Sequence, residues 1–253
     1  MSTILITGAA GGLGRELARS FFDEGHRLVL ADSQEVPLQE TAAWIGGDSA
    51  RVRTACVDIT EEDQIARMVA DLGDGPIDVL INNAGLQHVA SLEEFEVEHW
   101  DRLMAVMLRG TFLLTKAIIP RMRAQRFGRV VNIGSVHSLV ASPYKSAYVA
   151  AKHGLLGLAK VAALETADAD ITVNTICPAY IRTPLVERQI KAQAVAHGIP
   201  EEEVIEKIML APMPKKTFIT AEEVAAAARF LISDAARNVT GQVIVIDGGW
   251  SIQ

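Results

Sequence analysis

Short runs rich in β-branched residues alternate along the whole chain with segments of helical spacing, such as Leu13, Leu17 and Phe21. Strands that alternate with helices form a parallel sheet covered on both faces. No internal linker, repeat or low-complexity tract divides the 253 residues. We therefore expect a single-domain α/β fold over residues 1–253, a Rossmann-type doubly wound parallel sheet of about seven strands with helices on both faces. The predicted strands are 3–7, 28–31, 51–57, 79–82, 129–133, 172–176 and 243–246.

A glycine-rich turn follows the first predicted strand and leads directly into a helix. Its glycines are Gly8, Gly11, Gly12 and Gly14. Glycines at such a turn let the backbone approach a pyrophosphate, and the helix N-terminus then faces the phosphate charge. A tight turn without a ligand is the alternative, but the strand before it and the helix after it favour a dinucleotide site.

Acidic and amide side chains end the next strands. Asp32 ends the second strand, where a carboxylate accepts hydrogen bonds from the adenosine ribose and repels a 2′-phosphate. No Arg or Lys stands in the glycine turn or beside Asp32, so we predict NAD rather than NADP. Asp58 either accepts from the adenine amino group or is a turn residue. Asn83, within Asn-Asn-Ala-Gly, closes the fourth strand at the sheet edge where ligands bind.

Three residues in the middle of the chain form a candidate catalytic group. Tyr148 and Lys152 are four apart in a predicted helix, so both leave the same face, and Ser135 follows a predicted strand. A free tyrosine has a pKa of about 10, and one close opposite charge shifts a pKa by roughly 1–3 units. Lys152 and a cationic cofactor ring are therefore expected to make Tyr148 a usable base. A surface Tyr and Lys beside an ordinary serine is the alternative interpretation.

Charge, hydropathy and cysteine usage limit the classes of function. The net charge of −7 without a basic stripe argues against a nucleic-acid partner. No uninterrupted apolar run is long enough to cross a bilayer, and the first strand begins at residue 2 or 3, so we expect neither a membrane anchor nor a signal peptide. Cys56 and Cys177 end apolar runs and are predicted to be reduced core residues of a cytoplasmic protein, without metal-ligand spacing.

The least regular segment is 178–220, which holds two short amphipathic helices and several prolines. A long insertion late in a compact domain is usually a lid or a binding element. We therefore predict that this segment is a substrate lid.

The signatures together resemble those of the short-chain dehydrogenase/reductase family over essentially the whole chain. The matching stretches are TGAAGGLG at 7–14, NNAG at 82–85, Ser135, YVAAK at 148–152, CPAY at 177–180 and IDGGW at 246–250. The resemblance implies a seven-stranded doubly wound domain, a homotetramer and reversible oxidation of an alcohol. It further implies that Ser135 holds the substrate oxygen, that Tyr148 is the acid/base, and that Lys152 lowers the tyrosine pKa and bonds the nicotinamide ribose.

The resemblance also implies which residues bind the two ligands. The cofactor residues would be Gly8, Gly11, Gly12, Leu13, Gly14, Asp32, Asp58, Ile59, Asn83, Ala84, Gly85, Tyr148, Lys152, Pro178, Ile181 and Thr183. The substrate carboxylate would be bound by Gln87, His137, Lys145 and Gln189. The methyl end would be lined by Tyr180 and Trp250, and the resemblance leaves open whether Trp250 comes from the same chain or from a neighbouring subunit. A cation with neutral donors around it suits a small hydroxy acid or keto acid. Solvated loop positions are the alternative for His137 and Lys145.

One position departs from the family pattern. The family usually has an asparagine in the helix after the fourth strand, where this chain has Met107. That asparagine is expected to hold a water that links the lysine to solvent, and methionine cannot do so. Dinucleotide binding with impaired catalysis therefore stays open. Dehydrogenation of another secondary alcohol, such as a cyclic alcohol, sugar or 3-oxoacyl thioester, is a separate alternative.

Overall fold

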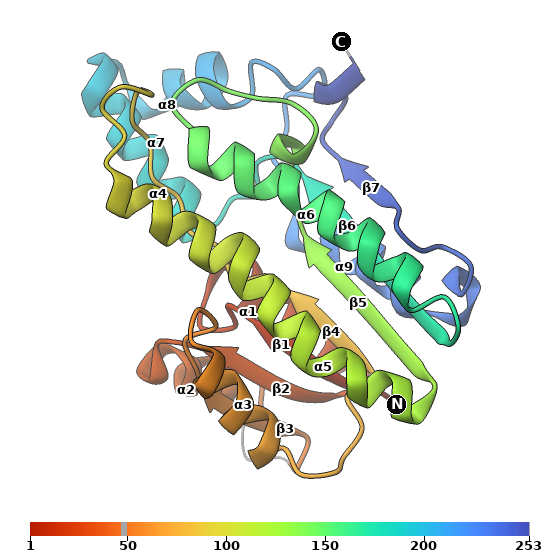
Figure 1. Cartoon of the computed structure of the whole chain (residues 1–253). Coiled ribbons are helices and arrows are strands. Elements are labelled where there is room, and N and C mark those ends of the chain that lie inside the picture. Colours follow the sequence, from red (N-terminus) through yellow and green to blue (C-terminus); the bar gives the residue numbers. More distant parts are fainter. Residues whose placement is uncertain (47–49, 253) are drawn as a thin grey trace.

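A computed structural model describes residues 1–46 and 50–252, and a seven-stranded parallel sheet lies at its centre (Figure 1). The strand order is β3-β2-β1-β4-β5-β6-β7. The expected strands are all present, with ends within two residues of the predicted positions. The strands are β1 (Thr3–Thr7), β2 (Arg27–Asp32), β3 (Val52–Cys56), β4 (Val79–Asn82), β5 (Phe127–Ile133), β6 (Asp170–Pro178) and β7 (Val243–Ile246).

Side chains that alternate along β1 build two separate cores. Ile4 and Ile6 pack in one core with Leu17, whereas Leu5 packs in the opposite core with Leu114. Successive strand residues point to opposite faces, so both faces of the sheet must be covered. Helices α1 (Gly12–Asp23), α2 (Glu35–Trp44) and α9 (Ala221–Ile232) cover the first face, and α3 (Glu62–Asp71), α5 (Thr111–Gln125) and α6 (Ser146–Glu165) cover the second. The predicted doubly wound fold is confirmed.

Helix α4 (Val97–Met104), the π-helical turn η1 (Ala105–Gly110) and α5 form one long rod beside α6 (Figure 1). The span Val97–Gln125 is long and apolar enough to cross a membrane by length and composition alone. Half of its most apolar window is buried inside the protein. The apolar side of α5 packs on the sheet, and the apolar side of α4 and η1 packs on α6.

The 178–220 segment lies at the end of the sheet to which the strand arrows point (Figure 1). It contains α7 (Pro184–His197), α8 (Glu201–Val204) and η3 (Ile205–Met209). Ile181 pairs with Ile219, so the two ends of the segment lie side by side. Between them is a small apolar core of its own, made by Val186, Ile190, Val204 and Met209. The expected helices are therefore present, and the lid role stays a prediction.

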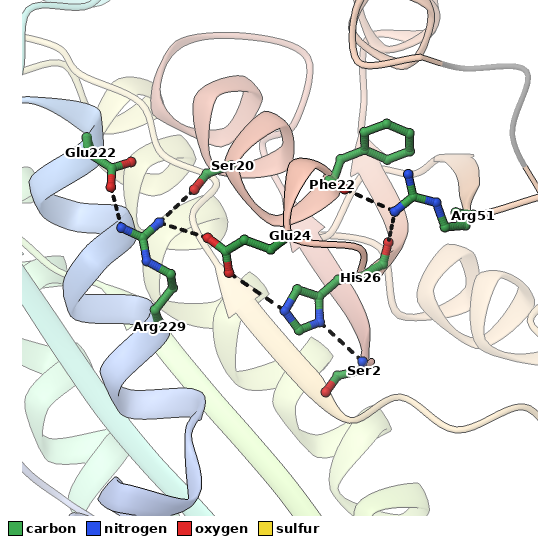
Figure 2. Close-up of polar contacts among 8 residues, drawn as sticks. All are labelled: Ser2, Ser20, Phe22, Glu24, His26, Arg51, Glu222 and Arg229. Atoms are coloured by element: carbon green, nitrogen blue, oxygen red, sulfur yellow. Dashed lines mark hydrogen bonds and ion pairs between the residues drawn. The ribbon is translucent and has the colours of Figure 1, made fainter.

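Figure 2 shows a chain of polar contacts that ties α9 to α1 and to the start of β1. Nη1 of Arg229 lies 2.9 Å from Ser20 Oγ and 2.9 Å from Glu24 Oε1. His26 Nε2 lies 3.8 Å from Glu24 Oε2, and His26 Nδ1 accepts a bond of 3.2 Å from the Ser2 amide. Half-exposed ion pairs of this kind contribute little to stability, so these contacts chiefly fix the register between the helices.

The two cysteines differ in burial, and one prediction is wrong. Cys177 in β6 is buried, but Cys56 is exposed because it ends β3, which is an edge strand. Both thiols are free.

Candidate active site

A cavity of about 1310 Å³ opens at the carboxyl ends of the central strands. The strand order reverses between β1 and β4, and crevices for ligands form at such a reversal. Most of the predicted site residues line this cavity. They are Gly8, Gly11, Gly12, Leu13, Asp32, Asn83, Gly85, Gln87, Ser135, His137, Lys145, Tyr148, Lys152, Pro178, Tyr180, Ile181, Thr183, Gln189 and Trp250.

The glycines of the turn have different tasks. A Cβ added at Gly14 would overlap the Gly8 carbonyl oxygen, so Gly14 is needed for packing of α1 on the sheet. A Cβ added at Gly11 would meet nothing within 4 Å, and Gly11 lines the cavity. Gly11 is also the N-cap of α1 and provides no side-chain cap, so the first amides of the helix keep unused donors. This cradle fits the pyrophosphate of a dinucleotide.

Asp32 lies at the end of β2 with its carboxylate bound to the backbone. Oδ2 accepts from the Ala10 amide at 3.0 Å, and Oδ1 accepts from the Gln34 amide at 3.0 Å. These bonds hold the carboxylate at the cavity wall, and each oxygen keeps a further lone pair for a ribose hydroxyl.

Four predicted cofactor residues do not line the cavity: Gly14, Asp58, Ile59 and Ala84. Asp58 Oδ1 accepts from the amide and the hydroxyl of Thr60 at 2.9 and 2.7 Å, which is the geometry of a turn residue. Ile59 is buried in the core. Asp58 therefore has the contacts of a turn residue, while its bond to the adenine amino group and the cofactor-binding role of Ile59 stay predictions.

Ser135 follows β5 and begins the 3-10 turn η2 (Val136–Ser138). Its Oγ accepts from the His137 amide at 3.2 Å, and its own amide donates to Ser138 Oγ at 3.2 Å. The Ser135 hydroxyl keeps its own proton to donate, and Ser135 and Tyr148 line the same cavity. These bonds hold the serine in one position.

Tyr148 and Lys152 lie one turn apart on α6, as predicted. Lys152 Nζ lies 5.7 Å from the centre of the Tyr148 ring and donates to the Ile133 carbonyl at 2.7 Å. Burial lowers the pKa of Lys152 to about 8. Burial raises the pKa of Tyr148 to about 12, against the hydrogen bond from Ser135 that lowers it. The side chains of the protein alone therefore do not lower the pKa of Tyr148 as expected.

Lys145 gives the cavity a buried positive charge. Its Nζ lies 2.9 Å from the Tyr180 hydroxyl and 3.4 Å from His137 Nε2, and the side chain is 7% exposed. Burial lowers the pKa of Lys145 to about 8. Burial and the charge of Lys145 lower the pKa of His137 to about 3, so this imidazole is neutral. Among the described residues Lys145 has no carboxylate partner.

The other predicted substrate residues surround this cation. Trp250 lies in the turn η5 (Trp250–Ile252), with its ring 5.3 Å from that of His137 and 5.7 Å from that of Tyr180. Trp250 therefore reaches the cavity of its own chain, and no neighbouring subunit is needed to supply it. Gln87 lines the same cavity, and its Oε1 is buried with no hydrogen-bond partner among the described residues. Gln189 enters from α7.

Several cavity residues were missed from the sequence. Arg15 follows the glycine turn and lies 4.5 Å from the centre of the Trp44 ring, and both line the cavity that Asp32 also lines. Arg182 and Arg188, from the 178–220 segment, line it as well. The position of Arg15 directly after Gly14 was a usable signal, but nothing in the sequence pairs it with Trp44.

Comparisons with known proteins agree with this geometry. The family model for the short chain dehydrogenases matches residues 2–194. A D-beta-hydroxybutyrate dehydrogenase of Rhizobium meliloti (strain 1021) is 46% identical over 258 residues, covering 99% of this chain and 99% of that protein. A D-beta-hydroxybutyrate dehydrogenase of Cupriavidus necator is 40% identical over 253 residues, covering 99% and 98%.

A solved structure of a single-substitution variant of actinorhodin polyketide ketoreductase with NADPH superposes with a TM-score of 0.92 at 31% identity. The match covers 100% of this chain and 98% of that one. The cradle at Gly11, the Ser135–Tyr148–Lys152 group and these likenesses point the same way. The chain belongs to the short-chain dehydrogenase family.

Proposed function

We propose that this enzyme reversibly oxidises (R)-3-hydroxybutyrate to acetoacetate with NAD as the cofactor. The observation that carries the substrate is the buried ammonium of Lys145, which lines the same cavity as Ser135 and Tyr148. A buried charge without an opposite partner is costly, so the site is complete only when an anion binds. The two relatives named as D-beta-hydroxybutyrate dehydrogenases support a hydroxy acid as that anion.

The spacing of the groups suits a small substrate. The His137 ring, which contacts Lys145, lies 6.0 Å from the Tyr148 ring between centroids. Because His137 contacts both Lys145 and the Tyr148 ring, we expect a short hydroxy acid to reach Tyr148 with its alcohol and Lys145 with its carboxylate. A neutral cyclic alcohol or a sugar would leave the ammonium of Lys145 unpaired.

In the oxidation direction, the Tyr148 phenolate accepts the substrate hydroxyl proton at Oη. The Ser135 hydroxyl donates to the same substrate oxygen and stabilises it as it becomes a carbonyl. Bound NAD would supply the carbon that accepts the hydride from substrate C3 and a positive ring that favours the phenolate. Lys152, fixed on the Ile133 carbonyl, places a second positive charge beside the Tyr148 ring.

The steady-state rate of NAD reduction with (R)-3-hydroxybutyrate tests the proposal, measured beside the S enantiomer and cyclohexanol. We expect turnover of the R enantiomer with kcat/KM at least about tenfold above the other two. Comparable or faster turnover of cyclohexanol would reject the hydroxy-acid assignment and keep only an alcohol dehydrogenase. Tight NAD binding without turnover of any substrate would instead favour impaired catalysis.

The preference for NAD over NADP belongs to the same proposal and is supported by Asp32. Its carboxylate would lie against a 2′-phosphate and repel it. Arg15 lines the same cavity, so the preference depends on Asp32 outweighing this cation. Asp32→Ser should raise the rate with NADP relative to NAD by about tenfold or more. An unchanged NADP/NAD ratio would show that Asp32 does not set the preference.

We also propose a cytoplasmic homotetramer with a mobile lid. Apolar side chains on α5 and α6, including Phe112, Val161 and Leu164, are exposed in the single chain, and subunit contacts would cover them. Light scattering after size-exclusion chromatography tests the tetramer.

Protection of the 178–220 amides from hydrogen exchange on adding NAD and acetoacetate tests the lid. Free thiols at Cys56 and Cys177 suit a reducing compartment, and fractionation of cells tests it.

A further inference from the structure

Tyr180 was expected to form an apolar wall at the methyl end of the substrate, but its polar end contacts the cation of the site. The Tyr180 hydroxyl lies 2.9 Å from Lys145 Nζ, and Nζ lies 5.0 Å from the centre of the Tyr180 ring. The phenol oxygen is thus directed at the group that would bind the substrate carboxylate.

The hydrogen bonds around Lys145 determine whether the Tyr180 hydroxyl proton already has an acceptor. A lysine ammonium has three donors and no acceptor, so Tyr180 Oη and His137 Nε2 must both accept from Lys145. The third N–H donor of Lys145 and the hydroxyl proton of Tyr180 are then left to bind a ligand. In the part of the chain that the structure describes, no side-chain or backbone group accepts the Tyr180 proton. Burial raises the pKa of Tyr180 to about 12, so the proton stays on the phenol.

The position of the phenol is fixed from both sides. The Tyr180 carbonyl accepts from the Ile219 amide at 2.9 Å, which anchors the backbone. The Tyr180 ring packs against Trp250 with 5.7 Å between centroids, and Trp250 in turn stands edge-on to His137. The unused donor is therefore held in place before any ligand arrives, which lowers the entropic cost of using it.

We infer that Tyr180 binds the substrate carboxylate through its hydroxyl proton, side by side with the ammonium of Lys145. This inference rests on the proposed function and changes one part of it: two neighbouring donors, one charged and one neutral, address the two oxygens of one carboxylate. Trp250 is then left as the aromatic wall for the alkyl end. The pair selects free acids over amides and esters, which are neutral and lack the two equivalent acceptor oxygens of a carboxylate.

The test measures binding of butyrate to the enzyme–NAD complex by calorimetry, because butyrate has the carboxylate and the carbon chain but no hydroxyl to oxidise. Tyr180→Phe should weaken butyrate binding by about tenfold to a hundredfold, the range for a hydrogen bond to a charged group. The affinity for NAD should be unchanged, which shows that the variant is folded. Butyramide, the neutral counterpart, should bind the wild type and Tyr180→Phe equally weakly.

Tyr144→Phe is the matched control, since Tyr144 is exposed and directly precedes Lys145 in the chain. It should bind butyrate like the wild type. Equal affinity of Tyr180→Phe and wild type for butyrate would overturn the inference, as would a wild type that binds butyramide as well as butyrate. If Tyr180→Phe loses butyrate while the wild type fails to oxidise (R)-3-hydroxybutyrate, the carboxylate site stands and only the proposed substrate is rejected.

Discussion

The ammonium of Lys152 donates a hydrogen bond of 2.7 Å to the carbonyl of Ile133, the last residue of β5. This bond joins helix α6 to the end of the central strand that leads to Ser135. The candidate catalytic lysine is therefore also a link between the two elements that carry the other members of the group. A substitution can therefore remove the charge of Lys152 while keeping the length of its side chain.

Lys152→Met keeps the length of the side chain and removes the charge. We expect kcat to fall by about 10²–10⁴, because the positive charge beside Tyr148 is lost. Single-turnover measurements of NAD reduction by stopped flow give the rate of the chemical step. A fall smaller than about tenfold would show that the Lys152 charge does not activate Tyr148.

Tyr148→Phe should abolish turnover and leave the affinity for NAD within about twofold, because only the proton-transferring oxygen is removed. Titration of NAD by fluorescence and a steady-state assay give the two values. The Tyr180→Phe variant, which keeps Tyr148, is the comparison that retains chemistry with weaker substrate binding. Turnover by Tyr148→Phe above about one hundredth of the wild-type rate would remove Tyr148 from the acid/base role.

Gly11→Ala and Gly14→Ala should separate ligand binding from packing. At Gly14 the new methyl would overlap the Gly8 carbonyl oxygen, so we expect a loss of about 1–3 kcal/mol or more in the free energy of unfolding. At Gly11 the methyl meets open space, so stability should be kept while NAD binds more weakly. Urea unfolding and NAD titration of both variants test this. Normal NAD affinity in Gly11→Ala would show that the pyrophosphate does not lie at that residue.

The buried Lys145 makes stability depend on pH in the alkaline range. Its folded-state pKa of about 8 is below the unfolded value of 10.5, so the unfolded chain binds more protons between these pH values. Stability therefore rises from pH 8 toward pH 10.5, by at most about 1.4 kcal/mol per pH unit for this one group. In Lys145→Met this contribution is absent, so the difference in unfolding free energy between variant and wild type should change across about pH 7–9.5. A pH-independent difference would contradict a lowered Lys145 pKa.

The same group predicts how butyrate binding responds to pH. Below pH 8 Lys145 is charged and binds the anion, and above it the ammonium of the free enzyme loses its proton. The dissociation constant of butyrate should therefore rise by up to about tenfold per pH unit above 8. Calorimetric titrations at several pH values check this. An unchanged affinity from about pH 7 to 9.5 would exclude Lys145 as the cation that titrates.

Met107→Asn tests the departure from the family pattern. Met107 is 1% exposed and packs with Leu103, Val106, Ala147 and Ala151. An amide there would be buried among apolar groups, so we expect a loss of about 1–3 kcal/mol in stability and no gain in rate. Thermal unfolding and kcat are the measurements. A clear rise in kcat would favour the alternative in which catalysis is impaired in the natural chain.

Much of the fold followed from local pattern. The alternation of apolar runs placed every strand within two residues, because a strand buried on both faces needs a continuous apolar run. Cys56 was misplaced because its burial depends on which strand lies at the edge of the sheet, and sequence order does not reveal strand order. Asp58 was ambiguous because the same carboxylate can cap a turn or bind a base.

The sequence by itself indicated the family, the doubly wound sheet and the candidate group Ser135, Tyr148 and Lys152, because signature stretches, helical spacing and glycine position are local properties of the chain. Only the tertiary structure decided that Tyr180 contacts Lys145, that Trp250 reaches the cavity of its own chain, and that Arg15 lies over Trp44. These contacts join residues that lie apart in the chain. The contacts of Tyr180 and Trp250 depend on how the 178–220 segment and the C-terminal turn fold back over the sheet, and the burial that results shifts the pKa values of Lys145 and Tyr180.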